Sequence, residues 1–176
     1  MASELRVDKI VPTDGVPTGG GGGIVQVKQV IHSNYVQYNQ NALTAGTSAG
    51  GNFAITITPK FSTSKILVSF NSMYDSYAAQ RNYITFYRSI GGGTASNVLT
   101  GSGAGRGLVE IWNNDHRVQS GVYAQYLDSP NTTSAITYQV QWASEGGATG
   151  YLNRPVTQDS VGANVASTIT AMEVAA

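Results

Sequence analysis

Apolar residues in this chain recur at every second position, and this spacing restricts the chain to β-structure. In the stretch FAITIT, Phe53, Ile55 and Ile57 alternate with smaller or polar residues, and Pro59 ends the pattern. Alternation of this kind is typical of a strand with one buried face, and proline cannot continue a paired strand. No segment of a dozen residues has apolar residues spaced by three and four, so long helices are not expected.

Seven further segments are rich in Val, Ile, Thr and Tyr and have strand character. They are residues 24–31, 65–74, 82–88, 107–112, 119–126, 135–143 and 165–174. Clusters typical of turns, such as GGG, DSPN and EGG, fall between several of them. About eight strands of this length suit two antiparallel sheets packed face to face. We therefore predict an all-β chain, an antiparallel β-sandwich of jelly-roll-like form.

The segment 82–88 differs from the other predicted strands because it carries bulky side chains on both faces. A single core can bury only one of these faces. The aromatic residues Tyr83, Phe86 and Tyr87 are therefore the candidates for a subunit interface.

A run of five glycines divides the chain and is predicted to be a hinge, because residues without a Cβ atom do not hold a fixed conformation. The run consists of Gly19, Gly20, Gly21, Gly22 and Gly23. It separates a short arm, residues 1–18, from a sandwich domain, residues 24–176.

The arm is too short to form a core of its own, and its two prolines exclude a continuous helix. Apolar side chains that could dock on a partner are spaced along it. They are Leu5, Val7, Ile10, Val11 and Val16. We expect this docking arm to lie extended on another protein and to pair with it by strand addition.

The charge balance argues against two classes of partner. Only 11% of the residues are charged, and 10 basic side chains balance 10 acidic ones. Because such a chain lacks a positive field, neither nucleic acid nor an anionic membrane is expected to bind it. The N-terminal residues contain no apolar run of signal-peptide length, so we expect synthesis in a cytoplasm without membrane insertion.

Catalytic and metal-binding chemistry finds little support in the sequence. Cysteine is absent, and His32 and His116 stand apart from any ligand pattern. The densest ionisable cluster, Glu110 with Asp115 and His116, favours a solvated turn over a pair of catalytic carboxylates. Neither the hinge nor the loop 101–107 has the spacing of a phosphate-binding motif. We predict no enzyme activity, no cofactor and no metal site.

Aromatic side chains in the loop SNYVQYNQN provide one further candidate site. Tyr35 and Tyr38 could stack on the apolar face of a sugar ring, and packing within the core or an interface is the alternative.

Four segments in the same order resemble small virion proteins and fibre-tip domains of tailed bacteriophages, particularly phages of cyanobacteria. They are SELRVDKIVPTDGVPTGGGGGIVQV, TPKFSTSKILVSF, YLDSPNTTSAITYQVQW and STITAMEV. The resemblance extends over nearly the whole chain. It implies a β-sandwich that forms a homotrimer and is attached to the particle through its N-terminal segment. The protein would then be made in the host cytoplasm and carried on the virion surface.

Two roles on a virion remain open, together with a third outside that class. As a cement or head-fibre protein, the chain would decorate the capsid and bind the major capsid protein through its arm. As a tail fibre, it would be held by a tail protein and contact a host surface polysaccharide. A chain of 176 residues without shaft repeats favours capsid decoration. A glycan-degrading enzyme would need a carboxylate pair that the sequence does not place.

Overall fold

The computed structural model describes residues 23–34, 36–38, 53–76, 80–99, 107–113, 120–144, 149–153 and 165–175. Eleven strands in these ranges form two sheets. The first sheet contains β1 (Ile24–His32), β2 (Val36–Tyr38), β4 (Lys65–Ser76), β8 (Ser120–Asp128), β10 (Gly150–Leu152) and β11 (Ser167–Val174). The second contains β3 (Ala54–Ile57), β5 (Gln80–Ile90), β6 (Ser96–Asn97), β7 (Val109–Asn113) and β9 (Ile136–Ser144).

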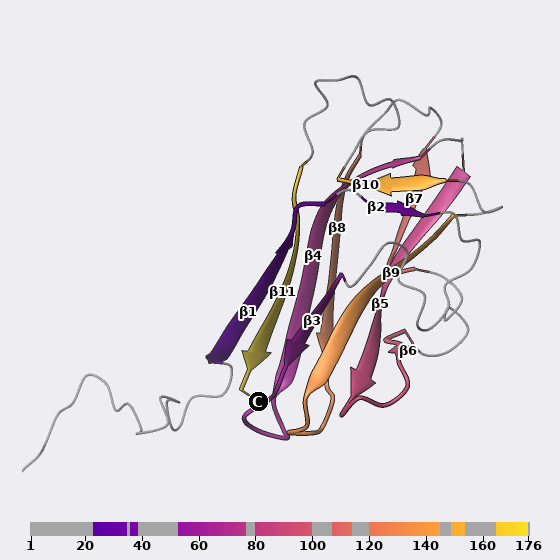
Figure 1. Cartoon of the computed structure of the whole chain (residues 1–176). Coiled ribbons are helices and arrows are strands. Elements are labelled where there is room, and N and C mark those ends of the chain that lie inside the picture. The colour runs from indigo at the N-terminus through magenta and orange to yellow at the C-terminus, as the bar shows by residue number, and fades with distance from the viewer. Residues whose placement is uncertain are drawn as a thin grey trace, which may run out of the picture.

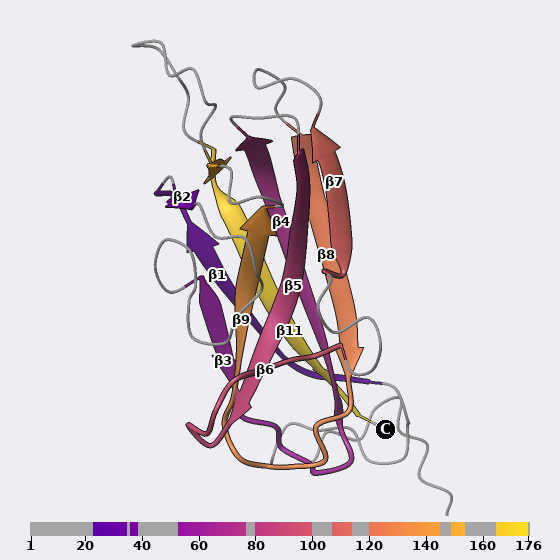
Figure 2. The same cartoon turned by 90° about the vertical axis from the view of Figure 1, so that its right-hand side faces the viewer.

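The pairing of the long strands is that of a jelly roll. β1 pairs with β11, β3 with β9, β4 with β8, and β5 with β7, all of them antiparallel. The strands therefore lie in the order β1-β11-β4-β8 in one sheet and β3-β9-β5-β7 in the other, as a folded-over antiparallel ribbon requires. The two layers face each other in Figure 1, and β9 and β5 lie in front of β11 and β4 in Figure 2. The predicted all-β sandwich is confirmed.

Each of the eight predicted strands overlaps one of the long strands. The three additional strands, β2, β6 and β10, contain only two or three residues each. Segments this short cannot show an alternating pattern in the sequence. In the structure β10 pairs with β4, β2 pairs with β10, and β6 pairs with β5.

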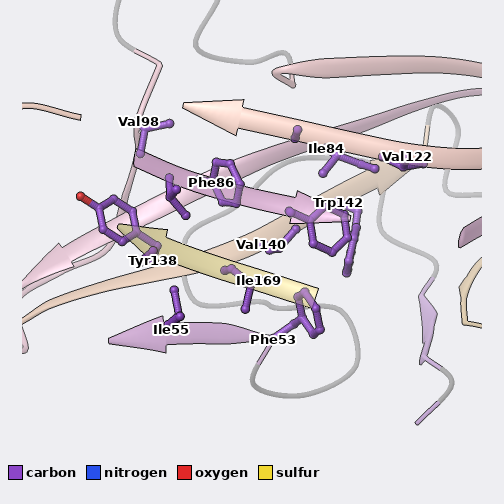
Figure 3. Packing of buried hydrophobic residues seen from close by; sticks show 14 of the residues in the cluster. Phe53, Ile55, Ile84, Phe86, Val98, Val122, Tyr138, Val140, Trp142 and Ile169 are labelled. Carbon is purple, nitrogen blue, oxygen red and sulfur yellow. The ribbon is translucent and has the colours of Figure 1, made fainter. Parts of the chain in front are cut away.

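The core lies between the sheets and follows from the alternation along each strand. In β11 every second residue is buried, and in β9 Ile136, Tyr138, Val140 and Trp142 all point inward. Figure 3 shows Phe53 and Trp142 together at one end of the cluster and Tyr138 at the other. The Trp142 and Phe70 ring centroids are 5.3 Å apart. Aromatic packing therefore joins the two sheets.

A buried carboxylate forms a polar link across the same core. Asp128 ends β8 in the first sheet and is 4% exposed. Its oxygens accept hydrogen bonds from the Arg88 guanidinium at 2.7 and 2.9 Å and from the Tyr138 hydroxyl at 2.6 Å. Both donors belong to the second sheet, so this link ties the sheets together at one end of the sandwich.

Burial, followed by the hydrogen bond to the Asp128 carboxylate, raises the pKa of Tyr138 far above its ordinary value. The phenol is therefore protonated at neutral pH and donates the hydrogen bond to Asp128.

We expect Tyr138→Phe to lower the free energy of unfolding by about 1.5–3 kcal/mol, because it removes a hydrogen bond to a charged acceptor. The matched control is Tyr126→Phe, whose hydroxyl donates to the neutral Val98 carbonyl at 3.2 Å. This change should cost only about 0.5–1.5 kcal/mol. Urea denaturation measures both values. Equal losses in the two variants would show that the hydrogen bond to Asp128 contributes no more to stability than the hydrogen bond to the neutral Val98 carbonyl.

Candidate assembly surface

The alternation of β11 also defines what the first sheet presents to solvent. Ile169, Ala171 and Glu173 point into the core, so Thr170 and Met172 point outward. Residues directly opposite each other in an antiparallel pair lie on the same face. The registers of β1, β11, β4 and β8 therefore assign the paired outward residues of these four strands to rows.

One of these rows is apolar from edge to edge. It runs from Val27 on β1 through Met172 on β11 and Leu67 on β4 to Leu127 on β8. Val27 is 53% exposed and Leu127 is 50% exposed. We call these four residues the apolar row. Full burial of a side chain of this size contributes about 1.5–3 kcal/mol, so covering the row would be favourable.

The rows on either side extend this surface. On one side Ile24, 62% exposed, lies opposite Val174. On the other side is a polar row formed by Gln29, Thr170, Ser69 and Gln125. Beyond it the most exposed apolar residues are Ile31 at 64% and Tyr123 at 57%.

The outer face of the first sheet is nearly free of charge. Among the outward positions in the described parts of β1, β11, β4 and β8, only Lys65 and Asp75 are charged, and Asp75 is fully buried. Depletion of charge together with exposed Val, Leu, Ile and Tyr is characteristic of the centre of protein–protein interfaces.

β1 forms the margin of this face and the edge of its sheet. Within the described residues it pairs with β11 on one side and with no strand on the other. Its exposed apolar residues occur on both faces, since Val30 lies on the inner side and is still 39% exposed. Exposed apolar edge strands readily associate with other chains unless they are covered.

A buried carboxylate holds the start of β1 in place. Glu173 is fully buried, and its Oε1 accepts hydrogen bonds from the backbone N–H groups of Lys60 at 2.7 Å and Phe61 at 3.2 Å. Its Oε2 accepts a bond from the Gln26 side-chain amide at 2.6 Å, and the same amide also donates to the Thr58 carbonyl. Glu173 thus joins β1, β11 and the loop between β3 and β4.

The other end of β1 is held by Asn153, which is also fully buried and has a φ of 61°. Its side-chain amide donates to the carbonyls of His32 at 2.9 Å and Asn34 at 3.0 Å. Asparagine tolerates this left-handed conformation better than most residues. The open edge of the sheet is therefore fixed at both ends.

The predicted docking arm and most of the hinge lie outside the described residues, including Leu5, Val7, Ile10, Val11, Val16 and Gly19 to Gly22. Gly23 is described, and its carbonyl accepts a hydrogen bond from the Ala175 backbone N–H at 2.9 Å. This glycine therefore extends the pairing of β1 with β11, and the hinge remains a prediction. Gly23, the first described residue, therefore lies at the edge of the first sheet.

The predicted interface on β5 requires a correction. Phe86 is 0% exposed and belongs to the core, so it cannot contact another chain. Tyr87 faces away from the core but is only 7% exposed. The chain after β5 returns over this side, where the Thr85 hydroxyl donates to Asn97 at 2.9 Å. Of the three aromatic residues, only Tyr83 stays partly exposed.

An exposed aromatic residue that the sequence did not single out lies at the edge of the second sheet. Trp112 on β7 is 54% exposed, and the Arg81 guanidinium carbon is 5.5 Å from its ring centroid. The Nε of Arg81 is also 3.6 Å from a carboxylate oxygen of Glu110. The candidate glycan contact Tyr35 lies outside the described residues, and only the backbone of Tyr38 is described.

The remaining ionisable candidates do not form a site in the described part of the chain. The ring of His32 packs edge-on against Phe53, with 5.1 Å between the centroids. Asp115 and His116 lie outside the described residues. Where the structure describes the chain, no three His, Cys, Asp or Glu side chains gather as a metal site would require. The same residues contain no helix of the length and apolarity needed to span a membrane.

Comparisons with known proteins gave similarities of structure only. No protein-family model and no curated protein sequence matches the chain. Among solved structures, the chain is similar to a chain in the structure of infectious bursal disease virus, Gt strain. The two share 14% sequence identity with a TM-score of 0.44, and the match covers 98% of this chain and 43% of the viral chain. The subviral particle protein VP2 of the same virus gives 11% identity, a TM-score of 0.41, and coverage of 98% and 43%.

A xylan-binding domain, CBM22-1, from Paenibacillus barcinonensis gives 12% identity, a TM-score of 0.34, and coverage of 90% of this chain and 99% of that domain. The chain spans less than half the length of the two viral chains. At these values the likeness is one of β-rich architecture alone.

We expect Glu173→Gln to lower the free energy of unfolding by about 1–3 kcal/mol. The new amide nitrogen must face either the two backbone N–H groups or the Gln26 amide, and all of these are donors. Turning Gln26 over would place its oxygen against the Thr58 carbonyl. Thermal unfolding followed by circular dichroism measures the loss.

The matched control is Glu110→Gln, a change at an exposed carboxylate 3.6 Å from its basic partner. It should alter stability by no more than about 0.5 kcal/mol. If both variants unfold like the wild-type protein, Glu173 does not hold β1 in the way described.

Proposed function

We propose that the chain is a non-enzymatic structural protein of a virus particle, a trimer that decorates the capsid as a cement or head-fibre protein. The observation that carries this proposal is the outer face of the first sheet, which carries little charge and exposes Val27, Leu127 and Ile24 next to the point where the N-terminal arm begins. A surface of this composition is suited to contacts with other proteins.

The arm is the proposed attachment to the particle. It joins the sandwich at Gly23, which is hydrogen-bonded to Ala175 at the end of β11. Ordering each arm residue costs on the order of 1–2 kcal/mol, and strand pairing and burial of Leu5, Val7 and Ile10 would offset this cost. The proposed binding partner is the major capsid protein. The protein would be made in the host cytoplasm and carried on the particle surface.

The second candidate is a tail-fibre protein that is held by a tail protein and contacts a host surface polysaccharide. The observation in its favour is Trp112, whose half-exposed ring lies beside the Arg81 guanidinium and the Glu110 carboxylate. An aromatic ring can stack on a sugar while the charged groups hydrogen-bond to its hydroxyls. Trp112 therefore joins Tyr35 and Tyr38 as a residue with which to test glycan contact.

Deletion of residues 1–18 should leave a folded trimer that no longer binds particles, because the sandwich does not need the arm for its core. The measurement is co-sedimentation with particles that lack the protein. In a full-length variant, changing Leu5, Val7 and Ile10 to Ser should also abolish binding. The matched control changes Thr13 and Thr18 to Ser and should bind like wild type. Binding by the truncated protein would show that attachment does not depend on the arm.

The number of copies in each particle distinguishes the two candidate roles. A shell protein is expected in hundreds of copies because it follows the capsid lattice, whereas a tail fibre is expected in about a dozen copies or fewer. Quantitative gel analysis against the major capsid protein measures this ratio. A count of a few copies would exclude capsid decoration and support the tail-fibre role.

A further inference from the structure

We propose that the outer face of the first sheet is the contact between copies of this chain, with the apolar row directed toward the axis of the trimer. The inference rests on the proposed function in one respect, that the chain is a trimer. The proposed function does not name the residues through which the copies touch, and this inference names them.

The apolar row is a continuous ridge rather than a set of scattered side chains. Val27, Met172, Leu67 and Leu127 follow one another across four hydrogen-bonded strands. Neighbouring strands lie about 4.8 Å apart, so the row is roughly 14 Å long. A row of this length, with Ile24 and Val174 beside it, can pack against the equivalent residues of another copy.

The absence of charge points to a second copy as the occupant. When identical faces meet, charges that are all of one sign approach each other, and such contacts are costly. Among the outward positions described, Lys65 is the exposed charged residue and lies in the end row beside Val174, whereas Asp75 at the other end of β4 is fully buried. The adjacent polar row offers amide and hydroxyl groups on Gln29, Ser69 and Gln125, each of which can both donate and accept. Such a face is complementary to itself.

The arm of the same or another chain is a poorer occupant. Within six residues it carries Glu4, Arg6, Asp8 and Lys9. Placing the arm across the apolar row would desolvate several of these charges, and Lys65 is the one exposed charged group that the described outward positions of β1, β11, β4 and β8 offer in return. The arm is better suited to a surface with charged partners, such as that of a different protein.

Trimer contact at this face would also place the arms usefully. Gly23 immediately precedes Ile24 at the margin of the face, so three faces around one axis would bring three arms to the same end of the trimer. Arms joined in this way bind at a high effective concentration.

The test is the mass of the full chain in solution, measured by light scattering at micromolar concentration. The wild-type protein should give three times 18.5 kDa. The double variant Val27→Lys with Leu127→Lys should give one chain, because it places two lysines of each copy in the contact. The matched control is Val165→Lys, a change of the same type at a valine that is 36% exposed and precedes β11. It should remain a trimer.

Protection of single cysteines gives a second measurement that does not depend on the lysine variants folding. The natural chain has no cysteine, so one introduced thiol reports one position. In the trimer, Gln29→Cys and Gln125→Cys should react with a maleimide at least tenfold more slowly than Ser96→Cys, an exposed position on β6. Equal rates at the three positions, or a double lysine variant that stays trimeric, would overturn the proposal.

The test of the trimer contact can be distinguished from the test of attachment through the arm. If the contact lies here, deleting residues 1–18 leaves the trimer intact and removes particle binding only. A wild-type dimer would refute the trimer but support this contact if the lysines dissociate it. A wild-type monomer would refute both.

Discussion

The register of β11 between β1 and β4 is the constraint on which the rest of this structure depends. Because side chains alternate with a period of two, shifting a strand by one residue moves every side chain to the opposite face. In the observed register, Ile169, Ala171 and Glu173 enter the interior. A shift of one residue would expose these groups and bury Met172 and Val174 in their place. The register that builds the core therefore also builds the outer face.

Buried polar groups make this register specific. Glu173 fits where two backbone N–H groups and one side-chain amide converge, and Asp128 fits where Arg88 and Tyr138 meet it from the opposite sheet. A hydrophobic residue can move within a core at modest cost. A buried carboxylate without its donors is destabilised by several kcal/mol. These two acids therefore exclude alternative pairings that apolar contacts alone would tolerate.

The two surfaces of the sandwich differ in a way that bears on the proposed function. On the second sheet, the outward residues Thr85 and Gln141 are fully buried, and the Thr85 hydroxyl donates to Asn97 on β6. On the first sheet, Val27 and Leu127 of the apolar row are about half exposed. The two sheets therefore differ in how much of their outer faces they expose. The proposed arm would begin next to the exposed face, which connects the proposed trimer contact with the proposed attachment to the particle.

The sequence by itself determined the class of fold and the positions of the long strands, because alternation and turn residues are local properties that adjacent residues reveal. The same local pattern showed that β5 has bulky side chains on both faces. It did not show that the chain after β5 covers Tyr87, or that Phe86 lies in the core. Nor did it show that Val27, Met172, Leu67 and Leu127 form one row. These residues come from four strands that are far apart in the sequence, and only the tertiary pairing of those strands sets their register and brings them to the same face.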